Sequence, residues 1–239
     1  MSSAVVYTIQ KTYFTDFINS LAREYRAFYL KSDKTSFGWK ESKRKLLYWQ
    51  EYKGDWEGLT LGEVRAQDPL KQFVFSSKEK VAEDFQGISY KAEKPILLIG
   101  AKNCDLSGLA ITDFVFLQGD FQDPFYINKR QSMFIIASDC SGPNDICFCT
   151  ALGLKPYPEN NYDMSVSDIG ESYLVEVVSD KARKYAEHNR GKFELATDSQ
   201  LKKRLNLRGN TINQVEKNAQ NNAVPQKLQL DGIMKKGFE

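Results

Sequence analysis

The sequence predicts an α/β protein, with a mixed, partly parallel sheet flanked by helices and a helical, polar C-terminal segment. Two continuous apolar runs, residues 95–100 and 133–137, have the pattern of strands that are buried on both faces. Residues 106–117 between them can form a helix, so the simplest interpretation is a strand, a right-handed crossover helix and a parallel strand. After residue 180 the chain becomes polar and rich in Lys, Asn and Gln.

The N-terminal part of the chain predicts scaffold elements. Alternating residues at the start predict a short strand, and the amphipathic helix that we expect next has apolar residues at helical spacing: Phe14, Phe17, Ile18 and Leu21. Residues 31–62 combine aromatic and charged side chains with two glycines, which favours an irregular hairpin or covering loop. We expect a short strand over residues 71–75 and one or two helical turns over residues 78–85.

The C-terminal part predicts one more strand, over residues 173–178, and then helices near residues 180–190, 198–206 and 211–220, with a loop around Pro225. We therefore divide the chain into an α/β domain, residues 1–180, and a helical basic segment, residues 181–239. The segment carries 13 Lys and Arg against 6 Asp and Glu. We expect it to pack against a partner or a further domain; the alternative is that it folds back onto its own α/β body.

Composition excludes several classes of function. A chain of 239 residues can bury a core without disulfides, and a net charge of +2 gives no general argument for binding nucleic acid. No apolar run approaches the roughly 20 residues that cross a bilayer, so we expect no membrane segment. The N-terminus lacks the pattern of an export signal, which predicts a cytoplasmic protein.

The chemistry of the sequence is concentrated in four cysteines. Cys104, Cys140, Cys147 and Cys149 are all the cysteines of the chain and lie within 46 consecutive residues. Cys104 and Cys140 each follow one of the two predicted buried strands. Because the carboxyl ends of neighbouring parallel strands open into the same crevice, these two thiols should approach each other. The Gly-Pro turn after Cys140 would let the loop with Cys147 and Cys149 return to the same place.

Converging thiolates suit a soft metal centre, either an iron–sulfur cluster or a tetrahedral zinc. The spacing, Cys-x35-Cys-x6-Cys-x-Cys, matches no common zinc ribbon, and it favours a [4Fe-4S] cluster over zinc. Zinc in a structural or adaptor subunit remains the alternative. Two disulfides, which a reducing cytosol disfavours, and four unrelated buried thiols are further alternatives.

Charged residues around the cysteines are further candidates. Lys102, with Lys129 and Arg130, could offset the negative charge of a thiolate-bound cluster, or these residues could be ordinary surface. Asp105 could ligate or tune the cluster, but the interpretation that we favour is a cap of the following helix. We expect His188 to be a surface histidine. No glycine-rich dinucleotide or phosphate-binding loop is present in the sequence.

The cysteine motifs resemble a known family in their order along the chain. The β subunit of cytoplasmic nickel–iron hydrogenases (sulfhydrogenases) and the A subunit of anaerobic sulfite reductase share this pattern, over roughly residues 65–180. The matching motifs include Cys104-Asp105-Leu106, Asp113-Phe114-Val115-Phe116, Asp123-Pro124-Phe125-Tyr126, Cys147-Phe148-Cys149-Thr150 and Tyr162-Asp163.

The resemblance implies an electron-transfer subunit whose four cysteines bind a cluster. It also implies redox partner subunits, ferredoxin-like or flavin-containing, and an activity that relays electrons without substrate chemistry. Two departures are visible: Lys102 stands where the family usually has arginine, and the ferredoxin-like domain that follows in relatives is not part of this sequence. We therefore expect either a truncated chain or a ferredoxin module on a separate polypeptide.

Overall fold

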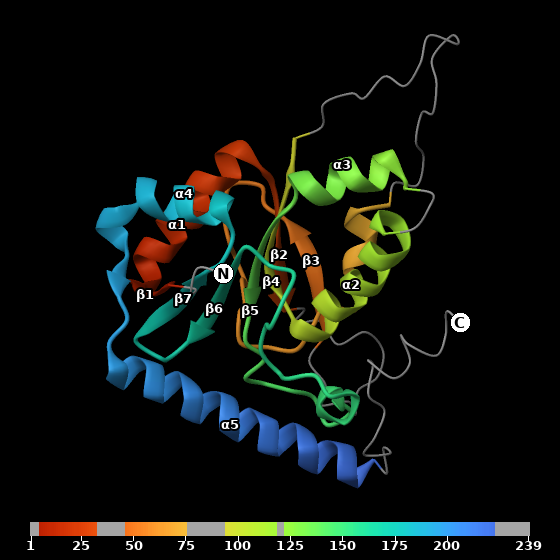
Figure 1. The fold of residues 1–239 in the computed structure, drawn as a ribbon. Helices are drawn as coiled ribbons and strands as arrows, with labels where there is room; N and C mark the ends of the chain where they lie inside the picture. The colour runs from red at the N-terminus through yellow and green to blue at the C-terminus, as the bar shows by residue number, and fades with distance from the viewer. Residues whose placement is uncertain (1–4, 33–45, 76–93, 119–121, 223–239) are drawn as a thin grey trace.

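The computed structural model describes residues 5–32, 46–75, 94–118 and 122–222 (Figure 1). Its strands form one eight-stranded sheet in the order β3-β2-β4-β5-β6-β7-β1-β8. The strands are β1 (Val5–Gln10), β2 (Arg26–Ser32), β3 (Leu47–Glu51), β4 (Ile96–Ala101), β5 (Phe134–Ser138), β6 (Met164–Asp168), β7 (Ser172–Val177) and β8 (Glu194–Leu195). The helices are α1 (Lys11–Glu24), α2 (Asn103–Leu117), α3 (Pro124–Ser132), α4 (Asp180–His188) and α5 (Asp198–Asn221), with short 3-10 turns η1 (Leu70–Phe73), η2 (Cys149–Leu152) and η3 (Arg190–Lys192).

The centre of the sheet is parallel and its flanks are antiparallel, which confirms the predicted mixed α/β class. β2, β4, β5 and β6 pair in parallel, while β3, β7, β1 and β8 extend the sheet with antiparallel pairings. Successive residues of β4 and β5 face opposite sides, and both sides are covered. Leu97 and Phe134 pack with α1 and α4 on one face, whereas Leu98 and Ile135 pack with α2 and α3 on the other.

Several predicted elements need correction. Residues 71–75 contain no strand: the 3-10 turn η1 follows Pro69 and buries Leu70 and Phe73 under α2. α3 and β6, and also β2 and β8, were not predicted from the sequence. The sequence did contain a signal for α3, because Asp123 is a residue type that caps helices and stands directly before this one. In the structure its side chain accepts hydrogen bonds from the Phe125 and Tyr126 backbone N–H groups. The helical turns expected over 78–85 and the loop around Pro225 lie outside the described residues.

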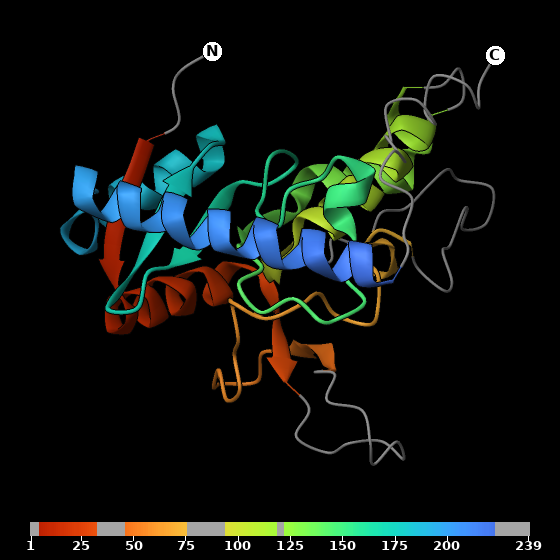
Figure 2. The same ribbon diagram turned by 90° about the horizontal axis from the view of Figure 1, so that it is seen from below.

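Residues 198–221 form one helix, α5, where two shorter helices were expected. A capping box opens it: the Thr197 side chain accepts from the Gln200 N–H, and Gln200 reciprocates. Its buried face carries Thr211, Val215 and Ala219, and η2 is packed against it. Figure 1 shows the helix running along the lower edge of the body, and Figure 2, which is seen from below, shows it crossing that side of the molecule. Residues 198–221 therefore pack on the body of the chain itself, as the alternative interpretation expected, and the packing of this segment against a partner stays a prediction.

Among the described residues, the helices include none that is long and apolar enough to cross a lipid bilayer.

Candidate functional site

The four cysteines lie at the carboxyl end of the parallel strands. Cys104 is the second residue of α2, which starts immediately after β4, and Cys140 follows β5 by two residues. The Cys140 N–H donates to the Pro156 carbonyl at 2.9 Å, and Cys147 closes a turn with Asn144 at 3.0 Å. Cys149 then opens the 3-10 turn η2. The site is therefore built from two strand ends and the loop between β5 and β6.

All four thiols are free, and they influence one another electrostatically. Burial is the main cause that raises the pKa of Cys140 to about 12 and of Cys149 to about 11, and it also raises the pKa of Cys104 and Cys147. Neighbouring thiols raise these pKa values further: Cys104 is coupled to Cys140 and Cys149, and Cys140 and Cys149 are each coupled to Cys147. The structure thus gathers the four cysteines into one group.

The thiols are not packed around a single point. Within the described part of the chain, no three His, Cys, Asp or Glu side chains are placed to hold one metal ion as they stand. Solvent also reaches the group: Cys104 is exposed at the surface although the surrounding protein atoms desolvate its thiol, and the apolar side chains of Ile146 and Phe148 lie on the surface beside Cys147 and Cys149.

Lys102 is buried beside this group, so the alternative that it is an ordinary surface lysine is wrong. Only 1% of the residue is exposed, and its ammonium donates to Ser138 Oγ at 2.7 Å, to the Asp139 carbonyl at 3.1 Å and to the Leu61 carbonyl. Burial lowers the pKa of Lys102, and the nearby Cys140 thiol is the largest influence that opposes this shift. The side chain therefore ties the ends of β4 and β5 together beneath the cysteines.

Asp105 is not the cap of α2 that the sequence analysis favoured. The helix starts at Asn103, and no side-chain hydrogen bond caps it. Asp105 lies in its first turn instead, where Oδ1 accepts from Arg65 Nη1 at 2.9 Å and Oδ2 is buried without a partner in the described residues. Burial raises the pKa of this carboxyl, and Arg65 opposes the shift.

Arg65 is a residue of this site that the sequence analysis missed. It lies in the loop that follows β3, and its guanidinium interacts with Asp105 and with the thiols of Cys104 and Cys147. No motif surrounds it in the sequence, so only the fold could place it here. By contrast, Arg130 of α3 pairs with Asp113 of α2 at 3.0 Å. The helix α3 leads into the amino end of β5, opposite the end that carries the cysteines. Arg130, like its neighbour Lys129, therefore does not border the cysteines.

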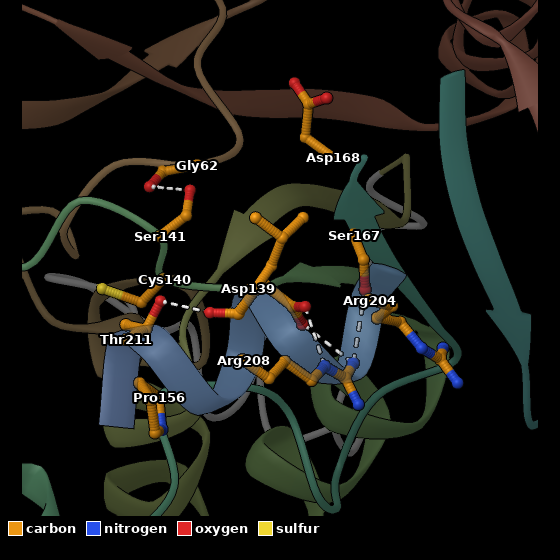
Figure 3. A pocket seen from close by; sticks show the side chains of 11 residues that line it. Gly62, Asp139, Cys140, Ser141, Pro156, Ser167, Asp168, Arg204, Arg208 and Thr211 are labelled. Carbon is orange, nitrogen blue, oxygen red and sulfur yellow. Dashed lines mark hydrogen bonds and ion pairs between the residues drawn. The ribbon is translucent and has the colours of Figure 1, made fainter. Parts of the chain in front are cut away.

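The helix α5 closes the other side of the site. Arg208 donates to both carboxylate oxygens of Asp139, at 2.8 and 2.9 Å, directly before Cys140. Farther along α5, the Asn218 side chain donates to the Asn144 carbonyl at 2.8 Å. A small pocket opens between α5 and the strand ends (Figure 3), and its lining includes Asp139, Cys140, Ser167, Arg204, Arg208 and Thr211. The helix thus holds the loop that carries three of the four cysteines.

The only histidine of the chain is far from this chemistry in the fold. His188 is exposed at the end of α4, where its Nδ1 contacts the Lys184 carbonyl at 2.7 Å.

The donor set fits a thiolate-bound metal centre. Four thiols are soft ligands, and they lie where ligands bind in open α/β sheets. The buried Lys102 ammonium and the unpartnered Asp105 oxygen show that charges at this end are not fully matched within the described chain. The fold and site therefore define an α/β protein with a cysteine-rich site at the carboxyl end of its parallel strands.

Comparison with known proteins finds a distant similarity to a hydrogenase subunit. Over 146 residues the chain is 26% identical to sulfhydrogenase 2 subunit beta of Pyrococcus furiosus. The match covers 60% of this chain and 43% of that subunit, so the chain is matched to less than half of its relative's length. No protein-family model matches the chain. The chain therefore has a weak similarity to a hydrogenase β subunit, and this similarity does not show that the chain belongs to that family.

Proposed function

We propose that this protein is an iron–sulfur electron-transfer subunit of a cytoplasmic oxidoreductase complex of the hydrogenase or sulfite reductase type. Cys104, Cys140, Cys147 and Cys149 would hold a [4Fe-4S] cluster, which accepts and donates single electrons. The observation that carries the proposal is the gathering of all four thiols at the strand ends, beside a buried lysine that pairs with no carboxylate among the described residues. A cluster bound by four thiolates carries net negative charge, which complements that lysine.

The spacing Cys-x35-Cys-x6-Cys-x-Cys favours a cluster over a single zinc ion, because it matches no common zinc ribbon. Zinc requires its four thiolates at about 2.3 Å from one point, which places the sulfur atoms almost in contact. A cube of iron and sulfide is larger, so its thiolate ligands stand farther apart. A zinc-stabilised structural or adaptor subunit remains the second candidate, because its ligands would be the same cysteines.

The chain's own residues have distinct tasks in this proposal. Lys102 places positive charge near the thiolates, whereas the charge of Arg65 is offset by its ion pair with Asp105. Residues 1–180 form the cluster-binding part. The basic segment 181–239 includes α5, which packs against η2 in the cysteine loop. These residues bind and orient; they perform no substrate chemistry.

The proposed partners are other redox subunits, ferredoxin-like or flavin-containing. A relay needs a second centre to give or take each electron, and the relative is by name one subunit of a sulfhydrogenase. Proteins that co-purify under anaerobic conditions, identified by mass spectrometry, would test this part of the proposal.

Anaerobic purification with iron and acid-labile sulfide analysis tests the cluster itself. We expect about four irons and four sulfides per chain and a brown protein with broad visible absorption. A colourless protein with one zinc per chain would support the second candidate. Protein that holds neither metal after anaerobic reconstitution would contradict both.

Single Cys-to-Ser variants assign the ligands. An alkoxide is a harder and more basic ligand than a thiolate, so each of the four variants should lose or degrade the cluster. Ser141→Ala is the matched control, because Ser141 adjoins Cys140 but donates only to the Gly62 carbonyl. Full iron content in all four cysteine variants would refute the assignment.

A further inference from the structure

Lys102 differs from four other cations of the described chain that are buried or half-buried. Arg130, Lys181, Arg204 and Arg208 each form an ion pair with a carboxylate. The Lys102 ammonium is more deeply buried than any of them, yet its hydrogen-bond acceptors are two carbonyls and one hydroxyl, all neutral. A buried charge is costly unless an opposite charge compensates it.

The acidic side chains near Lys102 are already engaged. Asp139, whose carbonyl accepts from Lys102, directs its carboxylate to Arg208. Asp105 directs one carboxylate oxygen to Arg65. Beside these two carboxylates, the ammonium interacts electrostatically with the thiols of Cys140 and Cys104, which follow the two strand ends that Lys102 joins, and Cys140 has the largest of these effects.

We propose that Lys102 sets the reduction potential of the bound cluster by placing an uncompensated positive charge against two of its thiolate ligands. This inference rests on the proposed function. When one electron passes from a reduced partner to the thiolate-bound cluster, the partner is oxidised, the cluster becomes more negative by one charge, and no bond forms or breaks. A fixed cation in a buried, weakly screened position stabilises that extra negative charge and raises the potential.

Arg65 provides a comparison within the same site. It also lies near the thiols, but Asp105 neutralises it through a 2.9 Å ion pair. Removing Arg65 and Asp105 together removes no net charge. Removing Lys102 takes away a whole charge, so the two changes separate the effect of charge from that of altered packing.

The test is an anaerobic redox titration followed by electron paramagnetic resonance, on the full chain with its cluster. In Lys102→Met the equilibrium constant for reduction should fall at least tenfold, which for one electron is a potential about 59 mV more negative. Lys102→Arg, which keeps the charge, should stay within threefold of the wild type. The double variant Arg65→Met, Asp105→Asn should also stay within threefold.

A wild-type potential in Lys102→Met would overturn the proposal, and so would an equal shift in Lys102→Arg and Lys102→Met. Where Lys102→Met does not load a cluster, Ser138→Asp decides, because it places a carboxylate at the oxygen that accepts from the ammonium at 2.7 Å. That variant should lower the equilibrium constant at least tenfold, and an unchanged potential would refute the inference. Failure of the proposed function is distinguishable, since the wild-type protein would then contain no iron.

Discussion

The two ends of β5 differ in how their buried charges are matched. At the amino end, Asp163 accepts from the Ile135 N–H at 2.8 Å and pairs with Lys181 at 3.3 Å. At the carboxyl end, the hydrogen-bond acceptors of the Lys102 ammonium within the described chain are neutral oxygens, and Asp105 keeps one oxygen without a partner there. Both ends are built from the same strands, so the difference arises from the side chains that follow them.

This difference separates scaffold from site. Buried charges that are paired within the chain serve the fold, whereas buried charges that are left unmatched lower stability and are usually kept for a function. The unmatched charges lie where ligands bind in open parallel sheets. The buried carboxylate at the amino end of β5 is therefore matched by groups of the chain itself, whereas the carboxyl end is suited to bind an anionic group.

The largest expected effect lies at the amino end. Asp163→Ala leaves the Ile135 N–H without its acceptor and Lys181 without its carboxylate, which should reduce the free energy of unfolding by about 3 kcal/mol, since the carboxyl is buried while Lys181 is partly exposed. Chemical denaturation measures this loss. Asp168→Ala is the control, because its ion pair with Lys11 is partly exposed and is worth about 1 kcal/mol or less. A loss as small as that of the control would show that the amino end is no better matched than the surface.

The next effect concerns the contact of α5 with the carboxyl end. Arg208→Met removes two charge-assisted hydrogen bonds to Asp139, and each partner is largely buried. We expect the free energy of unfolding to fall by about 2–3 kcal/mol. Adding Asp139→Asn should recover part of this loss, because the unpaired carboxylate is then removed. A double variant no more stable than Arg208→Met would contradict the ion pair as the cause.

The sequence predicted the central strands because their burial pattern is simple. β4 and β5 are covered by helices on both faces, so they read as unbroken apolar runs. β6 escaped prediction because two of its buried positions are Ser165 and Ser167. Residues 70–73 contain apolar side chains at both ends, and their turn follows from packing under α2, which a single sequence does not reveal.

The site was predictable only where it depends on strand order. Cys104 and Cys140 follow adjacent parallel strands, so their neighbourhood could be derived, while their role as ligands remains a prediction. The burial of Lys102 depends on the Leu61 carbonyl, 41 residues away in the chain, and Arg65 reaches Asp105 across 40 residues. Such contacts leave no local pattern, because they arise when separate loops fold against one another.

Alkaline pH should reduce the free energy of unfolding through the thiols at the carboxyl end of β5, whereas the amino end has no such thiol among the described residues. In metal-free protein, Cys149 has a pKa of about 11, raised from an ordinary 9.0 mainly by burial. Between these values the unfolded chain loses a proton that the folded chain keeps, so stability falls as pH rises. We expect this thiol to cost roughly 1 kcal/mol at about pH 10. Comparing the pH dependence of the wild type with that of Cys149→Ser isolates the effect, and parallel curves would contradict it.

The smallest expected effect tests how α5 holds the cysteine loop. The Asn218 amide donates to the Asn144 carbonyl at 2.8 Å, three residues before Cys147. Asn218→Ala should reduce the free energy of unfolding by only about 0.5–1 kcal/mol, the net value of one neutral hydrogen bond. Hydrogen exchange should nevertheless show faster opening of residues 141–148, because a loop with few apolar side chains depends on such contacts.

Asn213→Ala, on an exposed position of the same helix, is the matched control and should change neither quantity. In the metal-bound protein the effect of Asn218→Ala on exchange should shrink, since three ligands from this loop would then be held by the cluster as well. If the loop opens equally fast in metal-free and metal-bound protein, the cysteines do not hold a shared centre. If Asn218→Ala leaves exchange unchanged in both, the loop is ordered by other contacts, and α5 serves the fold more than the site.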